Sequence, residues 1–483
     1  MPNPTPTPPS PAGWSPASWK SRPAGAVIGY ATGAADPAAA ARVADDAAAT
    51  LRALPPLVTS WEIEKLKRLI AEAQEGKRFL LQGGDCAETI ADCTPARITN
   101  KLKILLQMSL VLIHAGKLPV IRVGRFAGQY AKPRSSTTET RRDATGRDVT
   151  LPSYCGELYN SAAFTPEARR LDPALMVRGY QHAAMTLNFI RALVDGGFAD
   201  LHHPEYWDLS FLRNAGLAPS LKAEYERMTA NLADGLRFME ALGEARVEEL
   251  TRVDFYTSHE GFNLLYESAQ TRTVPRRDGH YDLTTHMPWI GDRTRAADGA
   301  HAEFFRGVRN PIGVKLGPGA TPADVLRLID TLNPADEPGR ITLITRLGAE
   351  RVRAVLAPLV RGVRGAGRRV LWSCDPMHGN GVVTASGVKT RSFDAILKEL
   401  EETFEMHESL GSRLGGVHFE LTGEDVTECM GGAAGVTEAQ LSTNYASVCD
   451  PRLNYQQALE MAFLLARRLA QTSGRNGGVP RAS

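Results

Sequence analysis

Residues 370–381, VLWSCDPMHGNG, place several metal-capable side chains directly behind an apolar run. Cys374, Asp375 and His378 follow the apolar residues VLW, and two glycines come next. Thiolate, carboxylate and imidazole groups bind divalent metals, but polar groups also cap strands and fill turns. One such cluster alone is better explained by a turn. Whether it binds metal depends on which other side chains lie near it in the fold.

Three further candidate ligands also follow strand-like runs. With His378 they make a set of one thiol, one imidazole and two carboxylates, namely Cys86, His378, Glu420 and Asp450. A lone Cys or His is more often a packed core residue than a ligand, but placement behind separate strands favours one shared site. A mixed sulfur, nitrogen and oxygen set suits a divalent first-row metal and does not choose among Mn, Fe, Co and Zn.

Basic residues recur at the same positions relative to the strand-like runs. A single Lys or Arg is often merely solvated, but several beside glycines are better explained by polyanionic ligands, because Arg binds phosphate and carboxylate bidentately. The set comprises Arg125, Lys132, Arg134, Arg293, Lys315 and Arg346. Anion sites and a Lewis acid in one pocket predict metal-assisted carbonyl chemistry on phosphorylated substrates.

Eight runs of strand character, separated by helix-like segments, would position these side chains. They are FLLQGG near Phe79, LPVIRVG near Pro119, VDFYTSH near Val253, THMPWIG near His286, PIGVKLG near Ile312, RITLITR near Ile341, RVLWSCD near Val370 and GGVHFELT near Val417. The alternation predicts an α/β protein with a parallel sheet, and eight repeats predict a closed (β/α)8 TIM barrel. The active site of such a barrel lies at the C-terminal ends of the strands.

The spacing of the runs is uneven. About eighty residues precede the first run, and more than a hundred separate the second from the third. We expect one catalytic domain over residues 26–470, with an N-terminal extension over about 26–77 and a helical insertion over about 200–245 between strands two and three. The Pro-rich residues 1–25 and the polar residues 471–483 are expected to be disordered tails.

Composition argues against a nucleic-acid-binding protein, a membrane-spanning protein and a disulfide-stabilised protein. The 483 residues are 43% apolar and 23% charged, with a formal net charge of +2, which offers no electrostatic field for nucleic acid. No stretch has the roughly 18 to 20 apolar residues of a membrane span, and the N-terminus lacks an apolar signal core. Six scattered cysteines do not make a disulfide framework and fit a reducing cytoplasm.

The chain resembles a known family over residues 60–468. The resemblance rests on LLQGGDCAE, GRFAGQYAKPRSS, VRGYQHAAMTLNFIRAL, DFYTSHEG, WIGDRTR, GVKLGPG, ITLITRLG, WSCDPMHGNG, GGVHFELTGEDVTECMGG and CDPRLNYQQALE. These motifs are similar to those of the type II 3-deoxy-D-arabino-heptulosonate 7-phosphate (DAHP) synthases. The resemblance implies a transferase that condenses phosphoenolpyruvate with erythrose 4-phosphate and water, releasing phosphate, in the first step of the shikimate pathway.

The resemblance also implies roles for individual residues. One divalent ion, with Mn²⁺ or Co²⁺ favoured and Fe²⁺ or Zn²⁺ as alternatives, would be held by Cys86, His378, Glu420 and Asp450. Phosphoenolpyruvate would be bound by Arg125, Arg293, Lys315 and Arg346, and the sugar phosphate by Lys132, Arg134 and Ser135. Catalytic roles fall to Lys132, Asp292 and Arg293. Lys132 is our candidate proton donor to the developing alkoxide, with metal-bound water as the alternative.

Three features depart from the family pattern or add to it. Asp292 stands where the resemblance leads us to expect a Glu, which shortens the reach of that carboxylate toward phosphoenolpyruvate or an attacking water. Cys155 stands where an Arg is usual. Cys86 and Cys449 could form a reversible disulfide if both face the metal, although we favour a reduced ligand beside an unrelated thiol.

Four other histidines and one glutamate lie in or beside the predicted strands and helices. His259 and Glu260 follow the third strand, so a substrate-facing role and a structural hydrogen bond are both open. We expect His286, His301 and His418 to be structural, because they fall within or beside strand and helix patterns.

The resemblance implies partners as well. It suggests a cytoplasmic homodimer or homotetramer that aromatic amino acids inhibit, with a chorismate mutase as a candidate partner. Two other interpretations are open: a synthase that uses arabinose 5-phosphate, against which KPRSS argues, and an inactive barrel that binds a partner, against which the complete ligand sets argue. The sequence does not distinguish an enzyme of general aromatic biosynthesis from one of a specialised pathway that makes a shikimate-derived product.

Overall fold

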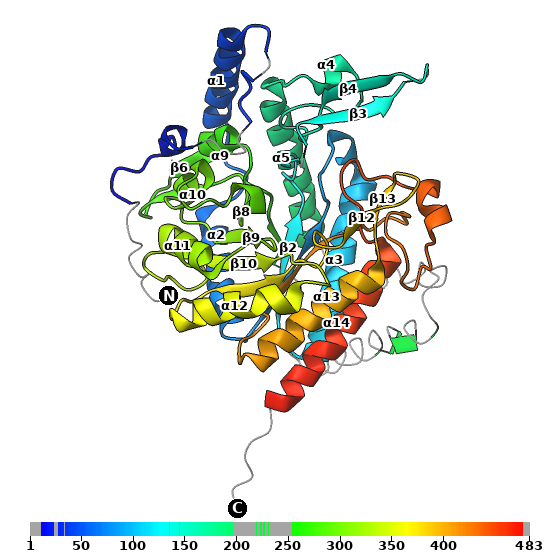
Figure 1. Cartoon of the computed structure of the whole chain (residues 1–483). Coiled ribbons are helices and arrows are strands. Elements are labelled where there is room, and N and C mark those ends of the chain that lie inside the picture. Colours follow the sequence, from blue (N-terminus) through cyan, green and yellow to red (C-terminus); the bar gives the residue numbers. More distant parts are fainter. Residues whose placement is uncertain are drawn as a thin grey trace, which may run out of the picture.

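A curled sheet of eight parallel strands, in the order β5-β2-β1-β14-β11-β10-β9-β8, forms the centre of the computed structural model (Figure 1). The structure describes residues 11–23, 28–32, 34–134, 136–143, 145–196 and 254–476, with isolated positions between 219 and 230. The strands are β1 (Phe79–Gly84), β2 (Val120–Arg125), β5 (Tyr256–Thr257), β8 (Trp289–Ile290), β9 (Ile312–Leu316), β10 (Ile341–Thr345), β11 (Leu371–Cys374) and β14 (Gly416–Glu420). Seven of them lie within one of the predicted runs, and β2 extends one residue beyond its run, so the parallel sheet is confirmed.

Backbone hydrogen bonds also connect the two outer strands of this order, β5 and β8. Met287 N donates to Thr257 O at 3.2 Å, and Trp289 N donates to His259 O at 3.0 Å. Gly261 N in turn donates to Trp289 O at 3.0 Å. The sheet therefore curls back on itself, which is consistent with a TIM-barrel-like fold.

Helices follow the strands and cover the outside of the sheet. They are α3 (Pro95–Gly116), α9 (Leu264–Gln270), α10 (Ala300–Phe305), α11 (Pro322–Leu332), α12 (Val352–Gly365), α13 (Phe393–Ser409) and α14 (Tyr455–Asn476). The starts of α3 and α11 follow from local chemistry, because Thr94 and Thr321 accept hydrogen bonds from the N3 backbone amides and proline occupies the first turn. Helices α3 and α14 pack side by side although the chain separates them widely (Figure 1).

The chain between β2 and β5 contains a projecting hairpin that the sequence did not predict. Strands β3 (Thr138–Arg142) and β4 (Asp148–Pro152) pair antiparallel, and α4 (Pro166–Arg169) and α5 (Ala174–Asp195) follow. Helix α5 contains the motif VRGYQHAAMTLNFIRAL, one of those on which the family resemblance rests. The expected helical insertion over about 200–245 lies outside the described residues apart from a few isolated positions. Two smaller hairpins, β6 (Thr271–Thr273) with β7 (His280–Asp282) and β12 (Gly381–Val383) with β13 (Lys389–Arg391), were also not predicted.

The N-terminal extension contains two helices, α1 (Pro37–Ala53) and α2 (Ser60–Gln74). Helix α2 packs Leu66 and Ile70 against residues near the starts of the strands, among them Leu80 and Leu371. Apolar side chains of α2 thus cover the end of the sheet where the strands begin. The opposite end, where the strands finish, is the end at which a barrel carries its active site.

The described part of the expected N-terminal tail is packed against the protein. Residues 11–23 include a short 3-10 helix, η1 (Ser18–Ser21), and the buried side chain of Trp14. The Trp14 indole donates its N–H to Glu303 O at 2.9 Å and contacts the ring of His280. The Pro-rich composition suggested disorder, but this aromatic side chain buries enough apolar surface to hold the segment in place.

Across the described part of the chain, the structure has no helix that combines the length and apolar character needed to cross a membrane.

Candidate active site

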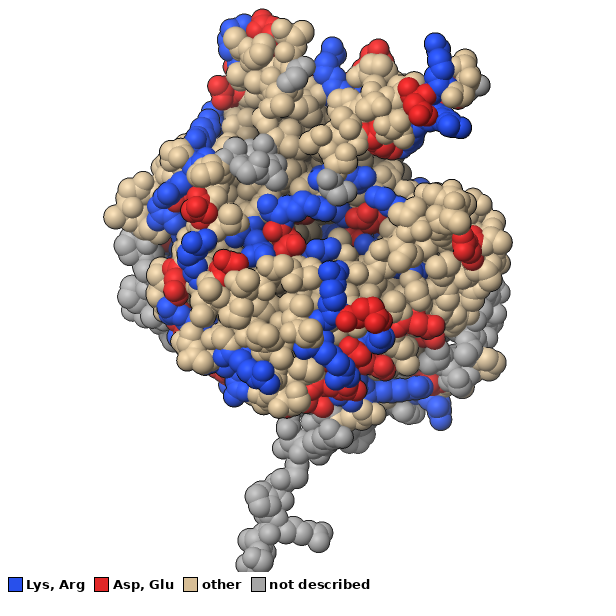
Figure 2. All heavy atoms as spheres, viewed as in Figure 1, with Lys and Arg blue, Asp and Glu red and all other residues tan. Residues whose placement is uncertain are grey.

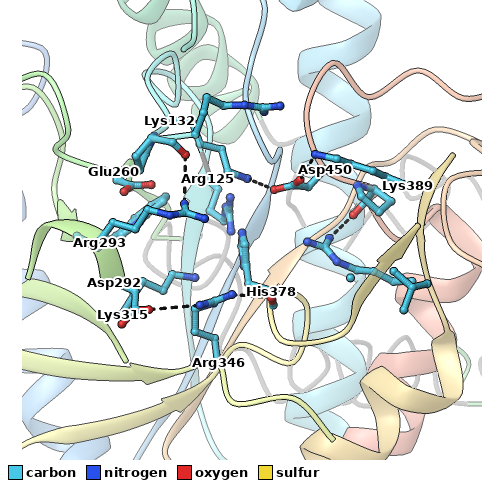
Figure 3. A pocket seen from close by; sticks show the side chains of 18 of the residues that line it. Arg125, Lys132, Glu260, Asp292, Arg293, Lys315, Arg346, His378, Lys389 and Asp450 are labelled. Atoms are coloured by element: carbon cyan, nitrogen blue, oxygen red, sulfur yellow. Dashed lines mark hydrogen bonds and ion pairs between the residues drawn. The ribbon is translucent and has the colours of Figure 1, made fainter. Parts of the chain in front are cut away.

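The side chains that follow the strands meet around a pocket with a cavity volume of about 330 Å³. Lys and Arg side chains gather around a hollow on this face of the molecule (Figure 2). The lining includes Arg125, Lys132, Arg134, Glu260, Trp289, Asp292, Arg293, Lys315, Arg346, His378, Lys389, Arg391 and Asp450. All six basic residues singled out from the sequence therefore share one cavity. They enter it from β2 and the loop after it, from β9, and from the segments after β8 and β10, and five of them are labelled in Figure 3.

Arg125, at the end of β2, is held rigidly at the base of the pocket. Its guanidinium donates to Glu420 Oε1 at 3.0 Å and to Asp85 O at 3.1 Å, and it lies over the Trp289 ring. Its Nη1 also contacts His418 Nε2 at 2.6 Å. Burial, with nearby cations, keeps the pKa of His418 well below its usual range, so the neutral ring accepts this hydrogen bond. The structural role expected for His418 is thus to orient Arg125.

Lys315 and His378 are joined through the buried carboxylate of Asp375. Lys315, in β9, contacts Asp375 Oδ2, and His378 donates from Nδ1 to the same oxygen at 2.7 Å. Burial lowers the pKa of Lys315 to about 8, although Asp375 opposes the shift. Burial would raise the pKa of Asp375, but His378 and Lys315 hold it well below its usual range. Asp375 thereby fixes the imidazole with its Nε2 facing Glu420, 2.9 Å from Oε1.

Asp292 anchors the far wall of the pocket. One carboxylate oxygen accepts from Gly317 N at 2.8 Å and from Arg295 Nε at 2.9 Å, and the other lies 3.4 Å from Arg346 Nη1. Arg293 donates to Pro133 O at 3.4 Å, which connects this wall to the loop that carries Lys132 (Figure 3). In the structure Asp292 thus positions backbone and arginine groups.

The four predicted metal ligands lie together in two overlapping groups. Ligand atoms of His378, Glu420 and Asp450 lie within 4.8 Å of one another, and so do those of Cys86, Cys449 and Asp450. The donors are sulfur, nitrogen and oxygen, a set that fits a divalent first-row metal. The described chain therefore offers side-chain groups that could hold a divalent ion.

The Lys132 ammonium stands among these ligands. Its Nζ lies 2.7 Å from Cys86 Sγ, 2.7 Å from Asp450 Oδ2 and 3.2 Å from Glu420 Oε1. Burial would lower the pKa of Lys132, but Asp450 and the other anionic groups raise it well above its usual value. The anionic shell thus already holds one positive charge, which supports its capacity for a cation.

A buried ionic network fixes the loops behind the ligands. Arg452 pairs with Asp85 at 2.7 Å and with Glu428 at 2.8 Å, and Lys101 pairs with Asp85 at 2.5 Å. Lys101 also lies 3.5 Å from Glu88, whose carboxylate accepts the backbone amides of residues 127–129. The loops that carry Cys86, Lys132 and Asp450 are therefore joined beneath the pocket.

Comparison with known proteins gives the family. The Class-II DAHP synthetase family profile matches residues 14–466. The chain belongs to the Class-II DAHP synthetase family. It is 46% identical over 481 residues to a phospho-2-dehydro-3-deoxyheptonate aldolase of Neurospora crassa, covering 96% of each chain. Proteins of the same name from Streptomyces coelicolor and Mycolicibacterium smegmatis are 47% and 45% identical, covering 86% and 87% of this chain and 91% and 89% of theirs.

These findings confirm the resemblance drawn from the motifs. They also confirm that the chain is an enzyme of the DAHP synthase type, a transferase. The matched region includes every described element of the pocket, from Cys86 after β1 to Asp450 before α14.

Two pocket residues of this DAHP synthase were missed by the sequence reasoning. Lys389 and Arg391 lie on β13, and both line the cavity. Lys389 Nζ lies 3.6 Å from Asp450 Oδ1, whereas Arg391 donates to Glu420 Oε2 at 2.7 Å. They precede a helix rather than follow a strand of the main sheet, so the search at strand ends did not reach them. The alternating basic residues of KTR were the available signal.

Glu260 and His259 prove to have different roles. Glu260 lines the cavity, and its Oε1 makes no hydrogen bond within the described chain. Burial raises the pKa of Glu260 to about 7, although Lys132 and other pocket cations oppose the shift. His259 instead contacts Glu267 Oε1 at 2.9 Å in the interior. The sequence left both roles open for each residue, and the structure turns only Glu260 toward the pocket.

The other predicted residues divide between described and undescribed positions. Ser135 lies outside the described residues, so its predicted contact with the sugar phosphate stays a prediction. His286 and His301 are buried, and His301 Nε2 lies 3.2 Å from Phe262 O, in keeping with structural roles. Cys155 is buried, and its thiol donates to Ser153 O at 3.4 Å.

Cys86 and Cys449 are free thiols that pack together beside the pocket residues Lys132 and Arg134. Arg134 donates from Nη1 to Cys449 Sγ. The hydrogen bond with Cys86 lowers the pKa of Cys449, and Lys132 and Arg134 lower it further against the effect of burial. The two sulfurs are thus close neighbours in the reduced protein.

Proposed function

We propose that this DAHP synthase condenses phosphoenolpyruvate with erythrose 4-phosphate and water, giving DAHP and phosphate, at a metal site in a closed (β/α)8 barrel. One observation carries the proposal: six basic residues and a sulfur, nitrogen and oxygen ligand set line or adjoin one cavity of about 330 Å³. Two anionic substrates and a Lewis acid need such a combination.

Phosphoenolpyruvate would bind on the side of the pocket formed by β9 and the loops after β8 and β10. Arg125 and Lys315 are buried there, and Arg293 and Arg346 complete the wall. Their donors would hold the phosphate and carboxylate of the substrate in one orientation. Fixing a substrate in this way contributes several kcal/mol to catalysis through entropy lost on binding.

The metal would be held by the four residues predicted from the sequence, Cys86, His378, Glu420 and Asp450. A bound divalent ion, with Mn²⁺ or Co²⁺ favoured and Fe²⁺ or Zn²⁺ as alternatives, supplies Lewis-acid polarisation of the aldehyde carbonyl. The chain's own groups prepare the shell. Asp375 orients His378, and Arg391 and Arg125 each hold one oxygen of Glu420.

Carbon–carbon bond formation would join the enol carbon of phosphoenolpyruvate to the aldehyde carbon of the sugar. The aldehyde oxygen becomes an alkoxide and needs a proton. Lys132 is the candidate donor, because it lines the cavity directly beside the proposed metal ligands. Arg134 and Ser135 would bind the sugar phosphate at the mouth of the pocket, with Lys389 on the facing hairpin as a further cation.

Water must then add to the carbon that bears the enol phosphate oxygen. Glu260 is our candidate base, because its carboxyl group faces the cavity without a hydrogen-bond partner for Oε1. It would take one proton from the water as the oxygen bonds to carbon. The resulting hemiketal phosphate then breaks its bond between carbon and the phosphate oxygen. The hydroxyl proton of the hemiketal passes to the departing phosphate, and the ketone of the product remains.

Loss of phosphoenolpyruvate ultraviolet absorbance by chelator-treated protein tests this proposal. The assay is run with erythrose 4-phosphate or arabinose 5-phosphate, before and after Mn²⁺ or Co²⁺ is added. We expect metal-restored loss with erythrose 4-phosphate alone. Restored loss with arabinose 5-phosphate would assign the other sugar, and no loss with either sugar would indicate an inactive, partner-binding barrel.

Regulation and assembly extend the proposal. We propose a cytoplasmic homodimer or homotetramer in which the N-terminal extension (about 26–77) and the insertion (about 200–245) serve interfaces and inhibition by aromatic amino acids. A chorismate mutase is the candidate partner. Light scattering tests the assembly, and unchanged activity with phenylalanine, tyrosine and tryptophan, singly and combined, would refute the inhibition.

A further inference from the structure

The hydroxyl group of Tyr30, in the N-terminal extension, makes two hydrogen bonds to distant parts of the chain. It donates to Leu158 O, and it accepts from Asn263 Nδ2 at 2.8 Å. The side chain is buried, with 5% of its surface exposed. Burial raises the pKa of Tyr30 far above its usual value, although the hydrogen bond from Asn263 opposes the shift. The hydroxyl therefore keeps the proton that it donates.

We propose that Tyr30 is a positioning residue of the synthase, whose hydroxyl holds the segment carrying Lys132 and Arg134 and the segment carrying Glu260 in the arrangement that binds the sugar phosphate. The inference rests on the proposed function, which assigns roles to these three side chains. The sequence assigned Tyr30 to an N-terminal extension and gave it no part in the pocket.

The first hydrogen bond reaches the segment of Lys132 through the turn that contains Leu158. Leu158 N donates to Tyr130 O at 3.0 Å, and Lys132 N donates to Cys155 O at 2.9 Å. Between these two bonds the backbones are in direct contact, since a Cβ on Gly156 would lie 2.2 Å from Tyr130 O. A displacement of Leu158 therefore moves the backbone that leads to Lys132.

The second hydrogen bond reaches the segment of Glu260 at its far end. Asn263 lies three residues after Glu260, and its Oδ1 accepts from Tyr266 N at 3.1 Å at the start of helix α9. Phe262 N donates to Glu260 O at 2.7 Å, so the chain turns tightly between the two ends of this segment. The Asn263 amide, fixed between Tyr30 and α9, thus holds the turn from which Glu260 lines the cavity.

Aromatic packing joins the same three parts of the chain. The Tyr30 ring stacks on the Tyr159 ring with 5.3 Å between centroids, and the Tyr159 ring meets the Phe262 ring edge-on at 5.7 Å. A phenylalanine in place of Tyr30 keeps this ring packing and removes only the hydroxyl. Tyr30→Phe therefore isolates the contribution of the two hydrogen bonds.

Loss of the hydroxyl leaves Leu158 O and Asn263 Nδ2 without this partner and loosens both segments. Erythrose 4-phosphate then meets a correctly arranged site in only a fraction of the molecules, which raises its KM. Tyr30→Phe should raise this KM by about three- to tenfold, the worth of one buried hydrogen bond. The KM for phosphoenolpyruvate should stay close to that of the original protein, because Arg125 and Lys315 lie within strands of the main sheet.

Steady-state kinetics of the full-length, metal-loaded protein, with each substrate varied in turn, test the inference. Tyr180→Phe is the matched control. The Tyr180 hydroxyl also donates one hydrogen bond, to Pro55 O in the N-terminal extension at 2.6 Å, but it bonds to neither pocket segment. Only Tyr30→Phe should raise the KM for erythrose 4-phosphate, and denaturant unfolding checks that both variants are folded under the assay conditions.

Asn263→Ser approaches the same contact from its other partner. Serine keeps an oxygen that can cap α9 but lacks the amide that donates to Tyr30. This variant should also raise the KM for erythrose 4-phosphate, and its effect should not add to that of Tyr30→Phe, because both remove parts of one network.

An unchanged KM for erythrose 4-phosphate in folded Tyr30→Phe would overturn the inference and leave the proposed function intact. An equal rise of the KM for both substrates would overturn it as well, because a general loss of structure does not distinguish the two sites. Absence of metal-dependent phosphoenolpyruvate loss in the unsubstituted protein would instead count against the proposed function.

Discussion

Glu260 is the pocket carboxyl group whose ionisation falls near neutral pH. Burial raises its pKa to about 7, and Oε1 makes no hydrogen bond among the described residues. A raised pKa keeps this carboxyl group protonated below about pH 7 and ionised above it. As a base it can take a proton from water only in the ionised form.

We therefore expect kcat/KM to rise with pH through about 7. Glu260→Gln should lower kcat by about 10²- to 10⁴-fold. It should also abolish the rise of kcat/KM with pH near 7. The pH dependence of kcat/KM in the two proteins is the measurement. If the Gln variant loses activity but its kcat/KM still rises with pH near 7, the ionisation belongs to another group.

Lys132 competes with the metal for the same ligands, because its ammonium contacts Cys86, Glu420 and Asp450. Lys132→Met should therefore bind Mn²⁺ more tightly and yet lower kcat by about 10²- to 10⁴-fold if the ammonium is the proton donor. Mn²⁺ titration and steady-state rates measure the two effects. Lys77→Met, at an exposed lysine, is the control and should change neither. A full rate in Lys132→Met would exclude the proton-donor role.

Among the secondary-structure elements, the loop after β10 and the loop after β11 are in direct backbone contact, at Gly348 and Gly379. A Cβ on Gly379 would lie 2.2 Å from Gly348 N and 2.6 Å from its Cα. This contact fixes the loop that carries His378. The glycine therefore allows a close approach that a side chain would prevent.

Gly379→Ala should destabilise the protein by about 1 to 3 kcal/mol through overpacking, and should weaken metal binding by displacing His378. Gly381→Ala is the matched control, because a Cβ there meets no atom within 4 Å. Denaturant unfolding and Mn²⁺ titration provide the readouts. Equal effects from the two substitutions would show that the backbone contact does not matter.

The β12–β13 hairpin contributes a cation that faces the predicted sugar-phosphate loop. The Lys389 side chain lines the pocket yet is 46% exposed, so its ammonium can reach a ligand at the mouth. Lys389→Met should raise the KM for erythrose 4-phosphate by about tenfold or more, the loss of one charged hydrogen bond, with little change in stability. Lys398→Met, at a surface pair with Glu350, is the control. An unchanged KM would place the phosphate elsewhere.

At the scale of the whole molecule, the buried indole of Trp14 is one of the contacts that hold the N-terminal segment against the barrel-like body, together with the ion pair between Arg22 and Glu303. Trp14 packs on Gly307, where a Cβ would lie 2.0 Å from its ring, and donates to Glu303 O. Trp14→Ala should cost about 3 to 5 kcal/mol of unfolding free energy, the usual range for a buried tryptophan. Trp61→Ala should cost little, because Trp61 is 68% exposed. Similar losses in thermal unfolding would argue against this docking.

The sequence by itself determined the eight strands and most of the pocket. The alternation of apolar runs with helix-like segments identified the strands. Because the ends of parallel strands meet at one edge, the sequence also placed the pocket residues Arg125, Lys315, Arg346 and His378. Long, ordered motifs such as WSCDPMHGNG determined the family, which the matches then confirmed.

Tertiary structure alone decided the residues that enter the pocket from outside the main sheet. Lys389 and Arg391 come from a side hairpin. The approach of Cys449 to Cys86, which the sequence left open, is also decided by the tertiary structure. Tertiary structure also decided that Glu260 faces the cavity while His259 turns inward. Local pattern fixes which face of a strand is apolar, but the direction of a loop side chain depends on contacts between segments distant in sequence.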